Sequence, residues 1–300
     1  MSRRFVHLVV NHNIRGWQAY KLCLIDPSRF FYPMKPSNGS AGDSTAREEF
    51  QLPPEAMTFY GPCCQKGRGY MDFMPLGQGN NKSIIGLDRK CRTIHCDAAS
   101  LAVGAMPAAH APKILPISVP VGDSLYVLQR NLAPWDHHCF EALIYGEGPE
   151  SRFFPDWYWH SLPPPPHVND SSYDESLEED YTPNEIDGHA LIGGLHIWVS
   201  TTKHAATYSF STVTGTWSKV ANWAMPFSGR AEYVPELNLW LGFSSRDNQL
   251  CATDLAAATA LQPPEVIGQW DDVAQPEEWI PVTSNIVPLG SGKMFIAKFF

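Results

Sequence analysis

The 300-residue sequence lacks the features that most readily identify an enzyme, a secreted protein or a membrane protein. It contains no G-x-S-x-G nucleophile elbow, no G-x-G-x-x-G fingerprint and no Walker-type phosphate loop. Its apolar N-terminal run, Phe5–Val10, is interrupted by His7 and is too short for a signal peptide. No segment approaches the roughly 20 apolar residues that a membrane-spanning helix requires. We therefore assign no catalytic, cofactor-binding or metal-ligating residue from sequence.

Positive charge and regularly spaced cysteines are also scarce. The chain has 22 basic and 31 acidic side chains, which give a formal net charge of −9. This acidic balance argues against nucleic acid or an anionic membrane as the main partner. The seven cysteines are an odd number without a repeated spacing. Such usage favours a reducing compartment, and we expect a cytoplasmic or nuclear protein.

Helical periodicity is missing as well, because no long stretch repeats apolar residues at i, i+3, i+4 and i+7. Hydrophobic residues make up 44% of the chain and aromatic residues 12%, beside 22 glycines and 26 prolines. This hydrophobic fraction supports a folded core. Frequent turn residues between aromatic-rich segments favour an all-β chain of short strands.

The clearest strand pattern lies in Ala206–Phe227. Every second residue of Ala206–Phe210 is apolar, Ser211–Gly215 is typical of a hairpin loop, and Thr216–Val220 returns as a second strand. We expect Trp217 to fill the gap between two stacked sheets.

Two further strands are predicted just upstream, at Ala190–Ile192 and Leu195–Ser200. The second strand alternates between two bulky faces, Leu195, Ile197 and Val199 on one and His196 and Trp198 on the other. Bulk on both faces is expected when a sheet lies between neighbouring sheets.

A weak internal repeat has the same pattern. An apolar strand is followed by a turn that begins with a short, oxygen-bearing side chain, and then by a return strand. The turn positions are Asp26, Asp97, Ser211 and Asp254, residue types whose side chains bond the backbone two residues on. From Asp26 to Asp254 there are 228 residues over four intervals, or 57 each, close to the roughly 50-residue period of kelch repeats. The sequence therefore predicts one domain, 3–300, folded as a kelch-like β-propeller of about five full blades plus an incomplete sixth.

The remaining predicted strands fill the other blades. They are Tyr20–Ile25, Phe30–Tyr32, Thr93–Cys96, Leu101–Pro107, Asp123–Gln129, Cys139–Tyr145, Trp157–Leu162, Ala231–Tyr233, Leu237–Ser244 and Leu250–Thr253, with a return near 261–264. A last hairpin, Ser284–Leu289 with Lys293–Phe300, supplies two strands of a sixth blade, and Phe5–Val10 is the natural strand for closing the ring.

Two insertions interrupt this pattern. The first, Gly146–Pro155, lies within the third blade. The second, Asn169–Asp187, holds eight acidic residues and no basic one, and we expect it to be disordered. It is a candidate for binding a basic partner or for phosphorylation at Ser171, Ser172 or Ser176, although a solvated, tolerated insertion is the simpler interpretation.

Several phrases of the sequence resemble a plant family of unknown function that is much expanded in grasses. They are MSRRFVHLVVN, DPSRFFYP, SLYVL, SLPPPP, TWSKVANWAMPF, GRAEYVPELNLWLGFS and LCATDL. The resemblance covers most of 3–300 and implies a kelch-type propeller, a class that serves widely as a platform for protein interactions. It implies no activity, because the family has none to carry over. Family members run further at the C-terminus, so the stop at Phe300 leaves ring closure open.

Metal and thiol chemistry have few candidates. Asp136–Cys139 gathers metal-capable side chains, but His160 and His167 provide no second ligand pair at zinc spacing, and a polar loop is favoured. Cys91 and Cys96 flank His95 on or beside a predicted strand, where cysteine behaves as a small hydrophobe. The adjacent Cys63 and Cys64 lie in a loop, and Leu76–Asn81 is more typical of a turn than of a nucleotide-binding loop.

Three functional hypotheses remain. The first is a non-catalytic propeller that binds an unknown protein through loops on one rim. The second is an enzyme or a carbohydrate-binding propeller with a site on the central axis, where tryptophans could stack on a sugar: Trp157, Trp159, Trp198 and Trp217. The third is a shortened member of a diversifying family. Pro163–Pro166 could present a polyproline surface, but a stiff connector between blades is favoured.

Overall fold

The computed structural model describes residues 5–14, 17–28, 51–61, 70–77, 83–133, 137–149, 154–168, 184–270 and 282–299. These residues form mainly antiparallel β-sheets joined by turns, with a short 3-10 helix, η1 (Pro166–Val168). The predicted all-β class is therefore confirmed. The chain divides into two compact units, 1–70 and 71–300. Within the described ranges, no helix has the length and apolar character needed to span a membrane.

The first unit contains one three-stranded sheet, sheet 1, in the order β1-β2-β3. Its strands are β1 (Val6–Ile14), β2 (Trp17–Ile25) and β3 (Glu55–Tyr60). Ala19 and Leu22 of β2 are fully buried. β1, the strand expected to close the ring, pairs along its length with β2. The return strand predicted at Phe30–Tyr32 and the pair Cys63 and Cys64 lie outside the described residues.

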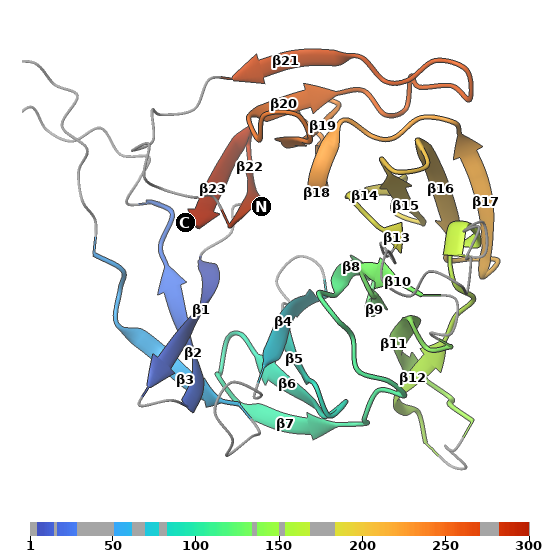
Figure 1. The fold of residues 1–300 in the computed structure, drawn as a ribbon. Coiled ribbons are helices and arrows are strands. Elements are labelled where there is room, and N and C mark those ends of the chain that lie inside the picture. Colours follow the sequence, from blue (N-terminus) through green and yellow to red (C-terminus); the bar gives the residue numbers. More distant parts are fainter. Residues whose placement is uncertain are drawn as a thin grey trace, which may run out of the picture. The chain divides into compact units, whose positions relative to one another are not determined.

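The second unit begins with two four-stranded antiparallel sheets (Figure 1). Sheet 2 contains β4 (Met71–Leu76), β5 (Ser83–Asp88), β6 (Thr93–Asp97) and β7 (Val103–Met106). Sheet 3 contains β8 (Ile117–Val121), β9 (Ser124–Leu128), β11 (Phe140–Gly146) and β12 (Asp156–Ser161). The predicted strands of both sheets are confirmed, whereas β4, β5 and β8 were not predicted.

Two further four-stranded sheets follow and join into one eight-stranded sheet. Sheet 4 contains β14 (Gly188–Ile192), β15 (His196–Thr201), β16 (Ala206–Ser211) and β17 (Thr216–Ala221). Sheet 5 contains β18 (Phe227–Val234), β19 (Leu239–Ser244), β20 (Leu250–Thr253) and β21 (Val266–Trp270). The first strands of the two sheets, β14 and β18, pair in parallel.

The joint between β14 and β18 depends on a glycine. An ideal Cβ added to Gly188 would lie 2.6 Å from the carbonyl oxygen of Phe227, which is backbone. A larger residue would push the two strands apart, so glycine is the residue that permits this close approach.

Two smaller sheets complete the described chain. β22 (Thr283–Gly290) and β23 (Lys293–Phe299) form the predicted C-terminal hairpin. β10 (Asn131–Leu132) pairs with β13 (Asn184–Glu185).

Two sequence predictions need correction. The return strand of sheet 5 was expected near 261–264, but Leu261 is 93% exposed and lies outside the strands, and the return strand is β21 instead. The acidic insertion was expected to be disordered through Asp187, but its last residues form β13 and bury Ile186. A buried side chain and a paired backbone fix this end of the segment. Residues 169–183, with the three candidate phosphorylation serines, lie outside the described residues.

The hydrophobic core of the second unit lies between successive sheets. One cluster joins sheets 2 and 3 through residues such as Ile85 and Leu143. A second joins sheets 3 and 4 through Phe140 and Phe210, whose rings meet edge to face with centroids 4.8 Å apart. A third joins sheets 4 and 5, and a smaller one joins sheet 5 to β22. Each sheet between two others therefore buries both faces, which makes the unit propeller-like.

The two faces of β15 confirm the predicted sandwich. Ile197 and Val199 are buried against sheet 3, while Trp198 packs into the cluster shared with sheet 5. Leu195, assigned to the buried face, is 47% exposed because it lies in the turn before the strand.

The predicted turn chemistry is also confirmed. In three turns the aspartate Oδ1 accepts a hydrogen bond from a backbone N–H. Asp26 accepts from Ser28 at 2.9 Å, Asp97 from Ala99 at 3.0 Å, and Asp254 from Ala256 at 2.9 Å. Each donor lies two residues after the aspartate, as expected for an Asx turn. At the fourth position, Ser211 Oγ accepts from Thr214 N at 3.3 Å, three residues on. The number of blades and ring closure stay predictions.

Candidate metal centre

The segment between β7 and β8 carries an amino group into the protein interior. Lys113 is 2% exposed as a residue, and its Nζ donates to the carbonyl oxygen of Ala111 at 2.7 Å. The segment is anchored to sheet 2 by a hydrogen bond of 2.9 Å from Ala109 N to the carbonyl oxygen of Cys91. A buried ammonium group requires an anionic partner, because desolvating an unpaired charge is costly.

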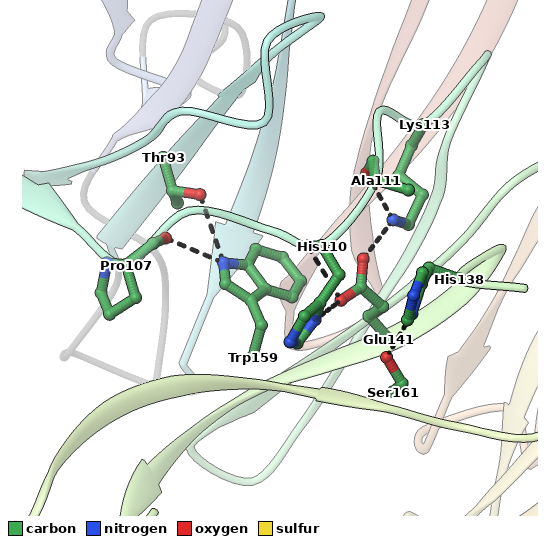
Figure 2. Close-up of polar contacts among 9 residues, drawn as sticks. All are labelled: Thr93, Pro107, His110, Ala111, Lys113, His138, Glu141, Trp159 and Ser161. Atoms are coloured by element: carbon green, nitrogen blue, oxygen red, sulfur yellow. Dashed lines mark hydrogen bonds and ion pairs between the residues drawn. The ribbon is translucent and has the colours of Figure 1, made fainter. Parts of the chain in front are cut away.

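Glu141 on β11 is that partner (Figure 2). Its side chain is completely buried, and its register partner on β12 is Ser161. The two carboxylate oxygens are used differently: Oε2 accepts from Lys113 Nζ, and Oε1 pairs with His110 Nδ1 and accepts from His110 N at 3.3 Å. Burial alone would raise the pKa of Glu141, but the hydrogen bonds from Lys113 and His110 outweigh it and hold that pKa below its usual value. The carboxylate is therefore ionised at neutral pH.

Two imidazole rings lie beside this carboxylate. His110 and His138 stack with ring centroids 5.2 Å apart and an interplanar angle of 19°. His138, in the loop before β11, hydrogen-bonds through Nδ1 to Ser161 Oγ at 2.7 Å. One potential ligand atom each from His110, His138 and Glu141 lies within 4.8 Å of the other two. Two imidazoles and a carboxylate are a ligand set that suits zinc and related ions.

Only part of the predicted metal candidate belongs to this cluster. Of Asp136–Cys139, the structure brings His138 to the site, His137 is exposed, Cys139 is buried, and Asp136 lies outside the described residues. Among the described residues, His160 and His167 are not members of the group.

Sequence reasoning missed the partners of His138 because they lie upstream. Lys113 and His110 precede Glu141 by 28 and 31 residues. One signal was available: Glu141 is a lone charge inside the apolar strand Cys139–Tyr145, and such a residue demands a partner.

The cysteine candidates behave as structural residues. Cys96 lies in β6 and is buried, and Cys91 lies in the turn before β6. Burial raises the pKa of both thiols, which disfavours the reactive thiolate. Between them, His95 bonds Ser83 Oγ through Nε2 at 2.8 Å. Part of Leu76–Asn81 lies outside the described residues.

The tryptophans considered for sugar stacking take part in packing. Trp159 Nε1 donates to the carbonyl oxygen of Pro107 at 3.0 Å, and Trp217 Nε1 donates to that of Pro163 at 2.8 Å. Each tryptophan lies on the outer strand of its sheet, and each accepting proline lies in the segment that follows the outer strand of the preceding sheet. Trp217 also lies 5.6 Å from Phe140 between ring centroids, as expected of a residue that fills the gap between sheets. Pro163 is therefore part of an inter-sheet connector.

The other two tryptophans are partly buried. Trp157 lies beside Tyr145, with ring centroids 5.5 Å apart, and Trp198 lies 6.4 Å from Trp223.

Three comparisons relate the chain to known proteins. A family model described as "Protein of unknown function (DUF1668)" matches residues 3–300. A comparison with curated proteins gave no significant match. Among solved structures, the chain is similar to the β-propeller domain of Cps50 (Swd1) from Myceliophteria thermophila, with 10% identity and a TM-score of 0.40. The alignment covers 80% of this chain and 66% of that one, just under two thirds of its length.

Proposed function

The chain belongs to the DUF1668 family of proteins of unknown function, and we propose that it is a non-catalytic scaffold that binds another protein through an open edge of its propeller-like fold. The edge is β21, the last strand of the eight-stranded sheet. Among the described residues, β20 is the strand that pairs with β21, so its other edge is open. An open edge is a template for adding a further strand.

The composition of β21 is the observation that carries the proposal. Val266, Ile267 and Trp270 are 46%, 62% and 46% exposed, and the strand contains neither charge nor proline. Proteins usually protect such edges with charged residues or proline. The opposite edge of the same sheet, β17, does carry a charge, Lys219. Within this sheet, the edge without charge or proline is therefore β21.

The charges around β21 indicate what kind of segment would pair with it. Glu265 precedes the strand, and Asp271 and Asp272 follow it in the sequence. A partner segment that is extended, apolar at its centre and basic at its ends would complement the edge. A second copy of β21 fits poorly, because an antiparallel pair centred on Gly268 would oppose Glu265 to Asp271.

The non-catalytic part of the proposal draws support from the tryptophans. Trp159 and Trp217, which could otherwise bind a sugar, have their ring N–H groups bonded to backbone carbonyls of inter-sheet connectors.

Affinity purification with a matched pair of variants tests the proposal. Ile267→Lys places a charge on the open edge, and Ser218→Lys places one at an exposed position of β17. We expect a reproducible partner that the wild type and Ser218→Lys capture equally and that Ile267→Lys loses. A synthetic peptide from that partner, extended and basic at both ends, should bind the purified wild type directly.

Two results would contradict the proposal. One is the absence of any reproducible partner, also after deletion of 169–183. The other is that Ile267→Lys captures the partner as well as the wild type does, while Ile267→Lys and Ser218→Lys melt at the same temperature.

A further inference from the structure

We propose that His110, His138 and Glu141 bind a divalent transition-metal ion of the zinc class. The proposal is independent of the β21 edge, because all three residues belong to sheet 3 and the segment that precedes it. It also departs from the sequence analysis, which assigns no metal ligand.

The donor set selects the class of ion. Zinc prefers imidazole nitrogen with carboxylate oxygen or thiolate, whereas calcium and magnesium prefer oxygen ligands alone. Two imidazoles and one carboxylate therefore favour zinc, with cobalt and nickel as close substitutes. Water would complete the coordination, since the three residues leave a tetrahedral position open.

Two of the three ligands are already held in place by neighbouring groups. Lys113 binds Glu141 Oε2, which leaves Oε1 on the side of the histidines. Ser161 Oγ binds His138 Nδ1 at 2.7 Å, so Nε2 is the nitrogen of His138 that can coordinate. Metal-binding histidines commonly have their second ring nitrogen fixed by such a hydrogen bond.

His110 is the ligand that has to adjust. Ligand atoms around a tetrahedral zinc ion are about 3.3 Å apart, given bonds of about 2.0 Å, and the three candidate atoms lie within 4.8 Å of one another. The His110 side chain is 46% exposed and lies on a connecting segment, so its ring can rotate towards an ion. Lys113 opposes binding, because its charge already compensates that of Glu141, and we therefore expect a weaker site than a closed structural zinc site.

The test uses the full chain after chelator treatment. Cobalt(II) is the spectroscopic probe, and zinc binding is followed by calorimetry. His110→Ala and His138→Ala remove one ligand each at accessible positions. His160→Ala is the matched control. His160 is exposed on β12 and pairs in register with Ala142, which belongs to the core between sheets 3 and 4. His160 therefore lies on the face of sheet 3 opposite to Glu141.

We expect the wild type to bind one equivalent of each ion, with visible cobalt absorption typical of nitrogen and oxygen ligands. Each ligand variant should lose at least tenfold in affinity, and His160→Ala should bind like the wild type. Ser161→Ala should weaken binding about 10- to 100-fold, the usual cost of removing a group that orients a ligand.

The proposal is overturned if the wild type shows no saturable binding. It is overturned equally if His110→Ala and His138→Ala melt at the same temperature as the metal-free wild type and bind the ions with wild-type affinity. Loss of binding in His160→Ala alone would place the site elsewhere and would also overturn it.

Discussion

Removing one member of the buried pair Lys113 and Glu141 should destabilise the protein far more than removing both. The side chains of both residues are 0% exposed. At a separation of about 3 Å and an effective dielectric constant of about 20, two unit charges attract by about 5 kcal/mol. Lys113→Met leaves a buried carboxylate, and Glu141→Leu leaves a buried ammonium group. We expect each single variant to lower the free energy of unfolding by about 3–5 kcal/mol.

The double variant Lys113→Met/Glu141→Leu leaves no unpaired charge. Replacing both members of a buried ion pair by apolar residues is often neutral or stabilising, so we expect the double variant to recover most of the loss. His110 moderates the recovery, because it loses its bond to Glu141 Oε1. The coupling energy from the double-mutant cycle should exceed about 2 kcal/mol.

The loss in Lys113→Met should also depend on pH. Without Lys113, the effect of burial, which raises the pKa of Glu141, is opposed mainly by His110. The folded-state pKa of Glu141 then rises above its unfolded value. A raised carboxyl pKa costs stability at neutral pH, and this cost shrinks as the pH falls through the folded pKa. Lys113→Met should therefore approach the wild type as the pH falls through the raised pKa, whereas Glu141→Leu should approach it only below the ordinary pKa of glutamate, where Glu141 of the wild type becomes protonated.

Urea unfolding in the presence of a chelator measures these free energies without a contribution from bound metal. Fluorescence and circular dichroism must give coincident transitions for the values to be comparable. A loss below 1 kcal/mol in Lys113→Met would refute the reasoning. So would a double variant as unstable as the sum of the two single variants.

Two further predictions concern sheet 4. His189 on β14 is buried, and burial with the charges of Arg230 and Arg130 lowers its pKa from 6.5 to about 3. A depressed histidine pKa gives stability that is lost as the pH falls below 6.5. The free energy of unfolding should therefore drop by about 2 kcal/mol between pH 7.5 and 5 because of His189. Urea unfolding should show that His189→Gln lacks this part of the decrease. Phe210→Ala removes a fully buried ring that contacts Tyr126, Phe140 and Trp217, so it should cost about 3–5 kcal/mol; a loss below 1 kcal/mol by the same assay would mean that sheets 3 and 4 do not share this core.

The parts of the fold that the sequence predicted are those encoded by neighbouring residues. Asp97 accepts hydrogen bonds from the backbone of residues two and three positions on, so its turn can be recognised in a window of a few letters. The strand at Ala206–Phe210 was predicted because alternation has a period of two, and it is observed as β16, Ala206–Ser211. The strands β3, β4, β5 and β8 were missed: their sequences, EAMTFY, MDFMPL, SIIGLD and ISVPV, contain prolines, a glycine or charges that blur the pattern.

The return strand of sheet 5 shows a different limit. The interval between Asp254 and β21 is longer than the turn Ser211–Gly215 of Ala206–Phe227, and Pro263 and Pro264 predicted that the return strand ends near 261–264. Proline does mark the end of pairing, but here it precedes the strand. Loop length is set by what the loop must span in space, which a one-dimensional repeat does not record.

The candidate metal centre could not be predicted because its residues meet through tertiary structure. The pairing of β11 with β12 brings Ser161 beside Glu141, and the packing of the preceding connector brings His110 and Lys113 to the same place. Yet the sequence did contain the physical problem that this arrangement solves. A carboxylate in the middle of an apolar strand cannot be buried alone, and the nearest lysine in a Pro- and Ala-rich connector has no reason to be buried except to meet it. Each charge explains the burial of the other, and together they fix where the connector crosses sheet 3, which is why we expect the pair to act as one unit in the double-mutant cycle.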